Sequence, residues 1–330
     1  MFGRTGEIGI DLGTTSVLVY VPEKGVVLRE PSVVAIDSMT KKIRAVGEEA
    51  QTLIGRTPGD VVAIRPLKDG VISDYYTTEK MLRNFLLKVC KNRIFKPRVV
   101  ICVPSSVTGV EERAVVEAAE AAGARQALVI EEPLAAAIGA GIDISRPEGN
   151  MVVDIGGGTT DIAVISFGGI VVSKSIKTAG NRFDESIVRY IRDKYGIAIG
   201  ERTAEEIKMN IGSVFPTDDE LSMEVKGRSL ASGLPKTVTV TGEEIVKPLT
   251  ECFAFVTDAV HETLSETPPE LVTDLCKNGI TLTGGGSLIK GAASLIQRET
   301  GISVTVADDA VACVAKGTGM ALSYIDLIAR

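Results

Sequence analysis

Glycine-rich turns that directly follow short apolar runs constrain this chain more than any other feature. They occupy residues 11–15 (DLGTT), 154–161 (DIGGGTTD) and 283–287 (TGGGS). The preceding runs, residues 8–10, 151–153 and 280–282, predict β-strands. Glycine lets a backbone approach a ligand closely and present its N–H groups to phosphate oxygens. One such turn would be weak evidence, but three together predict a single nucleotide site built from distant segments.

The first two turns are followed by similar patterns, which indicates an internal duplication. Each leads into an apolar run, residues 17–21 in one case and 162–165 in the other, then a short turn and a further run from residue 26 or residue 170. Both segments predict a strand, a phosphate-binding turn and a hairpin of two more strands. A repeat of this kind predicts two similar domains. A nucleotide held between them would touch both and favour a hinge movement.

The backbone amides and hydroxyls of the first two turns are the predicted phosphate ligands. The residues concerned are Gly13, Thr14, Thr15, Ser16, Gly156, Gly157, Gly158 and Thr159. The alternative is a pair of ordinary tight hairpins, but a plain hairpin needs only one glycine at positive φ. The chain contains no GxxxxGK[ST] motif, which excludes a P-loop NTPase.

Asp11 and Asp154 each stand at the end of a predicted strand, just before the glycines. Magnesium keeps several waters and takes one or two carboxylates together with phosphate oxygens. We therefore expect these two side chains to hold Mg2+, mainly through water. The alternative is that each aspartate only caps its own turn.

Composition limits the class of protein and its partners. Apolar residues make up 45% and charged residues 24% of the 330, as in globular proteins. The net charge of -7 argues against nucleic acid as a main partner. We find neither a run of 18 apolar residues nor a signal-peptide pattern. The five cysteines form no CxxC pair, so we expect reduced thiols and a cytoplasmic protein.

Strand and helix patterns alternate along the chain, which predicts an α/β fold. Residues 99–103 predict a buried strand, and residues 221–241 alternate as in a small sheet. The predicted helices cover residues 111–122, 183–195, 244–264, 287–300 and 310–328.

The glycine turns resemble those of the actin, Hsp70 and sugar-kinase superfamily, and the chain as a whole resembles the MreB family of bacterial actins. The superfamily shares the turns. The stretches that are similar to MreB are RPLKDGV at residues 65–71, GERTAE at 200–205 and PPEL at 268–271. The chain departs from the family at Thr15 and Ser16, where MreB proteins usually have Ala-Asn, and this leaves the contact of the Ser16 side chain open.

The resemblance implies an actin-like fold in which two related lobes, each on an RNase H-like core, surround a nucleotide cleft. Each lobe carries a smaller inserted subdomain. The implied division is 1–31, 67–145 and 318–330 for subdomain IA, 32–66 for IB, 146–180 and 244–317 for IIA, and 181–243 for IIB. Residues 316–319 (KGTG) resemble the link between the lobes.

The resemblance also assigns catalytic and nucleoside contacts, with ATP or ADP as the ligand. Glu132 matches the glutamate that activates the attacking water, and Thr159 is expected to help position that water. The alternative for Glu132 is a favourable charge at a helix N-terminus. Adenosine contacts are implied for Glu205, Glu206, Lys208, Thr283, Gly284, Gly285, Gly286 and Ser287. Glu205 and Lys208 could equally form an exposed ion pair.

Ile94 and Phe95 form an apolar pair among the basic residues Lys88, Lys91, Arg93, Lys96 and Arg98. An apolar pair on a basic loop indicates contact with a membrane surface. In MreB proteins an apolar loop at this position inserts into the cytoplasmic leaflet, and Met1-Phe2 could add to the contact. The alternative is that Phe95 packs in the core.

The implied function is an ATPase that polymerises into paired protofilaments on the inner face of the cytoplasmic membrane. There it would organise cell shape and wall elongation with membrane-embedded partners. The alternatives are an Hsp70-type chaperone ATPase domain and a sugar kinase. The first would require a substrate-binding domain beyond the nucleotide lobes, and the second a longer chain for its sugar pocket.

Overall fold

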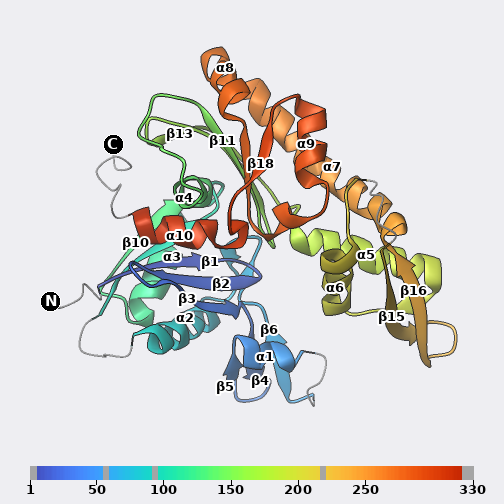
Figure 1. Ribbon diagram of the computed structural model, residues 1–330. Coiled ribbons are helices and arrows are strands. Elements are labelled where there is room, and N and C mark those ends of the chain that lie inside the picture. Colours follow the sequence, from blue (N-terminus) through green and yellow to red (C-terminus); the bar gives the residue numbers. More distant parts are fainter. Residues whose placement is uncertain (1–5, 55–58, 91–95, 216–220, 322–330) are drawn as a thin grey trace.

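The computed structural model describes residues 6–54, 59–90, 96–215 and 221–321. Two five-stranded mixed sheets form its two lobes (Figure 1). The first sheet has the order β10-β9-β1-β2-β3, and the second has the order β13-β12-β11-β17-β18. The bounds of these strands are β1 Glu7–Leu12, β2 Ser16–Val21, β3 Gly25–Pro31, β9 Arg98–Val103, β10 Gln126–Glu131, β11 Asn150–Ile155, β12 Thr160–Ser166, β13 Gly169–Ile176, β17 Ile280–Thr283 and β18 Val304–Val306.

The two sheets have the same topology, which confirms the predicted duplication. In each, a central strand (β1 or β11) pairs antiparallel with the strand that follows its glycine turn and parallel with a later strand. Each also has a register shift between its second and third strands, at Val19/Tyr20 and at Val164/Ile165. The glycine turns therefore occupy equivalent positions in the two lobes.

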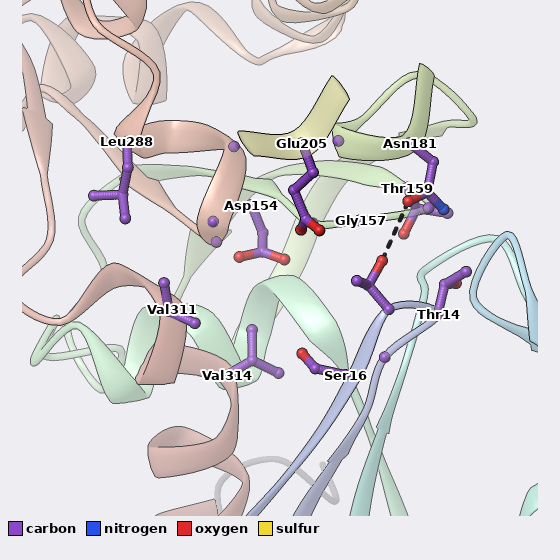
Figure 2. A pocket seen from close by; sticks show the side chains of 18 of the residues that line it. Thr14, Ser16, Asp154, Gly157, Thr159, Asn181, Glu205, Leu288, Val311 and Val314 are labelled. Atoms are coloured by element: carbon purple, nitrogen blue, oxygen red, sulfur yellow. Dashed lines mark hydrogen bonds between the residues drawn. The ribbon is translucent and has the colours of Figure 1, made fainter. Parts of the chain in front are cut away.

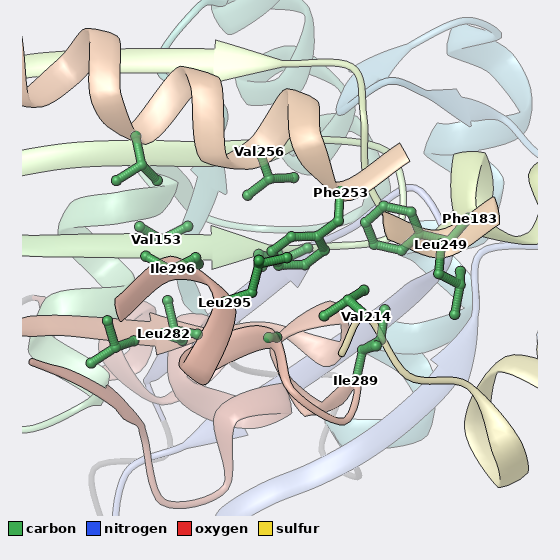
Figure 3. Close-up of a cluster of buried hydrophobic side chains, with 14 of the residues drawn as sticks. Val153, Phe183, Val214, Leu249, Phe253, Val256, Leu282, Ile289, Leu295 and Ile296 are labelled. Atoms are coloured by element: carbon green, nitrogen blue, oxygen red, sulfur yellow. The ribbon is translucent and has the colours of Figure 1, made fainter. Parts of the chain in front are cut away.

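Amphipathic helices cover the outer face of each sheet. Helices α2 (Tyr75–Val89) and α3 (Gly109–Ala122) pack together beside the first sheet, and Thr108 and Glu111 form a capping box at the start of α3. In the second lobe α7 (Gly242–Glu266) and α9 (Ala292–Thr300) enclose a core in which the Phe183 and Phe253 rings stack at 5.9 Å (Figure 3). This apolar packing fixes the sheet edges from which the turns project.

Two helices, α4 (Glu132–Gly139) and α10 (Cys313–Met320), cross closely between the lobes (Figure 1). A Cβ atom on Gly139 would lie 1.8 Å from the Cys313 carbonyl oxygen, and one on Gly317 would lie 1.7 Å from the Ala135 carbonyl oxygen. Only glycine permits this approach. One buried cluster around α4 joins Val100 and Ile130 of the first sheet to second-sheet residues such as Val152. The lobes thus share a packed core beneath the cleft.

Each lobe continues into a smaller sheet. In the first lobe this sheet contains β4 (Val34–Asp37), β5 (Ile43–Val46) and β6 (Val61–Ile64), with α1 (Glu48–Thr52) beside it. In the second it contains β14 (Ile197–Ala198), β15 (Ser222–Ser229) and β16 (Pro235–Thr241), with α5 (Gly180–Tyr195) and α6 (Glu201–Ile211). The remaining elements are β7 (Leu67–Lys68), β8 (Val71–Ile72) and α8 (Pro269–Asn278). The subdomain bounds drawn from the sequence stay predictions.

Two predicted helices begin later than the sequence pattern indicates. The predicted helix at 287–300 is a 3-10 turn (Gly285–Leu288) followed by α9, because Gly291 has a left-handed φ of 81° and interrupts the helix. The predicted helix at 310–328 is a 3-10 turn (Ala310–Ala312) followed by α10, and residues 322–328 lie outside the described ranges. No helix within the described ranges is long and apolar enough to cross a bilayer.

Candidate nucleotide-binding site

A cavity of about 490 Å3 lies between the lobes, and both predicted phosphate turns line it (Figure 2). The predicted site residues that line it are Asp11, Gly13, Thr14, Thr15, Ser16, Glu132, Asp154, Gly156, Gly157, Gly158, Thr159, Glu205, Lys208, Gly284, Gly285 and Gly286. Segments up to 275 residues apart in sequence, from Asp11 to Gly286, thus meet at one cavity.

The two turns face each other so closely that glycine is required in the second. A Cβ atom on Gly157 would lie 1.9 Å from Oγ1 of Thr15, and one on Gly158 would lie 2.5 Å from Oγ1 of Thr14. Real Cβ atoms do not approach other heavy atoms this closely. Across the same gap Thr15 Oγ1 donates to Asn181 Oδ1 at 3.3 Å (dashed in Figure 2). The amides of the two turns can therefore reach a single phosphate chain.

Different neighbours hold each turn in place. In the first, Ser32 Oγ donates to the Gly13 carbonyl oxygen at 2.5 Å, and the Gly70 amide donates to Thr14 Oγ1 at 2.8 Å. Gly70 belongs to the RPLKDGV stretch. In the second, the amides of Gly180 and Asn181 donate to the carbonyl oxygens of Gly156 and Gly157 at 3.1 and 2.8 Å. These bonds occupy carbonyl oxygens and one hydroxyl of the turns. The Gly156 amide itself donates to the Thr159 carbonyl oxygen at 3.0 Å, so the other N–H groups of the two turns are the ones predicted to meet a ligand.

Asp11 and Asp154 both line the cavity in a desolvated environment. Burial raises the pKa of each carboxyl group to about 7, although hydrogen bonds from Cys102 and Thr283 act in the opposite direction. Cys102 Sγ donates to Asp11 Oδ1 at 3.5 Å, and Thr283 Oγ1 donates to Asp154 Oδ1 at 2.6 Å. A nearby cation would reverse this shift, because opposite charge favours the ionised carboxylate.

Glu132 is the first residue of α4 and its side chain is buried. Burial, followed by the charges of Asp161, Asp154 and Asp11, raises the pKa of Glu132 well above its usual range. The preceding Glu131 is exposed, so only the second of the two adjacent glutamates faces the cavity. Asp161, the last residue of the second glycine motif, is fully buried, and its Oδ1 accepts from the Ser105 amide at 3.2 Å. The sequence reasoning assigned no role to Asp161.

Three predicted nucleotide contacts do not line the cavity. Glu206 is exposed on a face of α6 that does not line the cavity, and its Oε1 lies 3.2 Å from Arg202 Nε. Thr283 is buried and donates to Asp154, whereas Ser287 is buried and donates to the Gly284 carbonyl oxygen at 2.6 Å. Thr283 and Ser287 therefore form hydrogen bonds within and beside the third glycine turn and do not face the cavity.

Apolar side chains form one wall of the cavity, and the sequence reasoning did not identify them. Leu288 and Met209 are 59% and 75% exposed, although both line the cavity. Leu18, Ile289, Val311 and Val314 line it too, and Figure 2 shows Leu288, Val311 and Val314 on one side. Such a wall suits a planar base. Its members come from distant elements and share no motif, although Leu288 and Ile289 directly follow the third glycine turn and Met209 follows Lys208.

The predicted membrane contact cannot be placed, since Ile94, Phe95 and Met1-Phe2 lie outside the described residues. Near this segment Lys88 Nζ lies 2.5 Å from Glu30 Oε1.

A model of the MreB/Mbl protein family matches residues 5–330. The chain belongs to this family. It is 52% identical to the cell shape-determining protein Mbl of Bacillus cereus, covering 100% of this chain and 99% of that protein. It is 50% identical to the cell shape-determining protein MreB of Escherichia coli K12, covering 98% and 95%.

Solved structures of the MreB/Mbl family agree with the fold. The crystal structure of MreB5 of Spiroplasma citri bound to ADP superposes with a TM-score of 0.93 at 42% identity, covering 98% of both chains. The AMPPNP-bound structure of the same protein gives 0.92. These matches confirm the predicted two-lobed, actin-like α/β fold. Family membership favours the MreB interpretation over the chaperone and sugar-kinase alternatives.

Proposed function

We propose that this chain binds ATP between its two lobes, hydrolyses it and couples the cycle to filament assembly. The observation that carries the proposal is the pair of glycine turns, one from each duplicated sheet, that face each other across one cavity. The ADP and AMPPNP complexes of the similar Spiroplasma citri protein support the ligand class.

Asp11 and Asp154 fit a magnesium ion that accompanies the nucleotide. Asp154 is buried and Asp11 is half-buried at the same cavity, and desolvation disfavours their ionised forms unless positive charge is near. Two carboxylates with phosphate oxygens and water form the donor set that Mg2+ prefers. When bound, the ion would supply positive charge that offsets charge on the phosphate oxygens.

We assign the steps of hydrolysis to residues of both lobes. The amides of the two turns bind and orient the phosphate chain, and the hydroxyl of Thr159 helps to place the attacking water. Glu132 accepts a proton of that water as the water oxygen bonds to the terminal phosphorus. The bond from this phosphorus to the β–γ bridging oxygen breaks, and ADP and inorganic phosphate leave. Because burial and the neighbouring aspartates raise the pKa of Glu132, positive charge brought by the nucleotide's metal ion would be needed to favour the ionised form that accepts this proton. The apolar wall formed by Leu288 and Val311 receives the base.

Assembly follows from a head-to-tail contact between copies of this chain. Such a heterologous contact does not close into a ring, so it produces filaments. The family resemblance adds that two protofilaments pair in antiparallel fashion. An ATP molecule that touches both lobes favours one lobe arrangement, and that arrangement is the one that assembles.

We also propose that the filament lies on the inner face of the cytoplasmic membrane as a peripheral protein. Full burial of Ile94 and Phe95 in the lipid interface would contribute roughly 1.5–3 kcal/mol per side chain, which is too little to hold a single subunit on the membrane. A filament repeats the loop, and avidity makes the sum sufficient. Membrane-embedded cell-shape proteins are the expected partners.

Sedimentation and phosphate release test the proposal together. The wild-type protein should pellet with Mg-ATP and release phosphate. Only monomers by light scattering and microscopy in ATP, ADP and AMPPNP would contradict the filament proposal. The Ile94→Ser/Phe95→Ser variant should still assemble in solution but lose co-sedimentation with anionic liposomes. Undiminished liposome binding at matched polymer concentration would place the contact elsewhere, with Met1-Phe2 the next candidate.

A further inference from the structure

Lys208 faces the cavity from α6, and residues of α5 fix its ammonium group. Lys208 Nζ lies 2.9 and 3.0 Å from the two carboxylate oxygens of Asp184, and it donates to the Gly180 carbonyl oxygen at 3.2 Å. Each side chain of the ion pair is only 12% exposed. A pair this shielded keeps a fixed geometry more readily than a surface ion pair does.

The contacts of Lys208 leave one of its donors for a ligand. An ammonium group carries three N–H bonds, and Asp184 and Gly180 provide two acceptor groups. Asp184 and Gly180 also line the cavity, as does Glu205, whose carboxylate points into it in Figure 2. A donor from Lys208 beside an acceptor from Glu205 matches the hydroxyl pair of a ribose.

The same segment of α5 also supports the second phosphate turn. The Gly180 amide donates to the Gly156 carbonyl oxygen at 3.1 Å, while the Gly180 carbonyl oxygen accepts from Lys208 at 3.2 Å. Asp184 stands one helical turn further along α5 and holds Lys208 from the other side. Asp184 therefore lines the cavity beside Lys208, four residues along α5 from the glycine that supports the phosphate turn.

We propose that Asp184 is a positioning residue for the nucleoside: it holds Lys208 in the orientation that contacts the sugar. This inference rests on the proposed ATP-binding function. Burial raises the pKa of Asp184 to about 6 although Lys208 acts in the opposite direction, so the carboxylate is ionised at neutral pH. Asp184 acts through Lys208, and we expect no contact between Asp184 and the phosphates.

Calorimetric titration with two ligands separates this role from a general structural one. Asp184→Asn preserves size but removes the charge, and it should weaken binding of Mg-ATP about tenfold. Binding of inorganic tripolyphosphate, which has no nucleoside, should change by less than about twofold. Unchanged ATP affinity, or an equal loss for both ligands, would overturn the proposal. Glu185→Gln is the matched control, because Glu185 on the same helix is 55% exposed, pairs with Arg182 and does not line the cavity.

A double-variant comparison tests whether Asp184 acts through Lys208. Lys208→Met and Lys208→Met/Asp184→Asn should bind Mg-ATP equally, and a further loss in the double variant would refute the assigned route. This comparison also serves if Asp184→Asn alone does not fold, because the double variant leaves no buried unpaired ammonium. If the wild-type protein binds tripolyphosphate but not ATP, or binds neither, the proposed function itself fails and the inference falls with it.

Discussion

The first two glycine turns share one sequence pattern, but the segments around them differ between the two lobes. In the first lobe, the strand at the sheet edge, β10, leads into α4, and Glu132 is buried at the cavity. In the second lobe, the equivalent strand β18 leads to Asp308 and Asp309, which are exposed. The second lobe instead contributes Glu205, Lys208 and Leu288 to the cavity wall.

This difference indicates a division of roles between duplicated halves. Both lobes have the elements assigned to a magnesium-bound phosphate chain: a glycine turn for the phosphates and an aspartate at the strand end for the metal ion. The buried candidate base belongs to the first lobe, and most of the candidate nucleoside wall belongs to the second. Each variant below tests whether a change in one lobe impairs the role of that lobe while the role of the other lobe stays intact.

The largest expected effect is on hydrolysis, in the first lobe. Glu132→Ala should retain ATP binding but slow phosphate release at least ~100-fold, the usual scale for loss of a general base. Glu131→Ala, which alters the adjacent exposed carboxylate, should hydrolyse normally. Phosphate release by Glu132→Ala at the wild-type rate would refute the assignment of the base.

The next effect concerns the contact between the turns. Gly157→Ala would place a methyl group where Thr15 Oγ1 lies 1.9 Å away, so the turns must separate. Overpacking of this kind costs about 1–3 kcal/mol, and we expect ATP affinity to fall roughly tenfold. Gly109→Ala is the control, since a Cβ there meets no atom within 4 Å and the residue does not line the cavity. Equal affinities for the two variants would show that the close approach is not needed.

Substitution of Asp11 and of Asp154 tests whether the two lobes bind one metal ion between them. Asp11→Ala and Asp154→Ala should each weaken ATP binding roughly tenfold in Mg2+, a typical scale for an indirect metal partner. With EDTA in place of Mg2+ the variants and the wild type should bind ATP alike. A loss that persists in EDTA would mean that the aspartates act on the turn rather than on a metal.

The smallest effect is on the stability of the nucleotide-free protein. Burial raises the pKa of Asp154 from 3.8 to about 7 in the folded state. The folded protein thus binds this proton more tightly than the unfolded chain, and the resulting stabilisation is lost as the pH rises through about 7. Asp154→Asn removes the buried charge, so its Tm should exceed that of the wild type by a few degrees at about pH 8 and by less at about pH 5. A wild-type advantage at the higher pH would contradict the desolvated environment.

Local sequence signals predicted the strands, the turns and most of the cavity, because each depends on neighbouring residues. Apolar runs define β1, β11 and β17, and the glycines mark where the chain meets a ligand. Features that depend on packing between distant elements were missed. Gly291 interrupts a helix through its left-handed backbone conformation. Asp184 is linked to the cavity through its ion pair with Lys208. Glu206 is adjacent to Glu205 in the sequence but lies on a face of α6 that points away from the cavity.

Hydrogen–deuterium exchange with and without Mg-ATP tests the central claim most directly, namely that one nucleotide is held by both duplicated turns. Amide exchange reports local protection segment by segment. We predict that peptides containing Gly13–Ser16 and Gly156–Thr159 become protected together, with the same dependence on ATP concentration. Protection confined to one of the two turns would contradict a shared site and would mean that the duplicated halves do not hold one ligand between them.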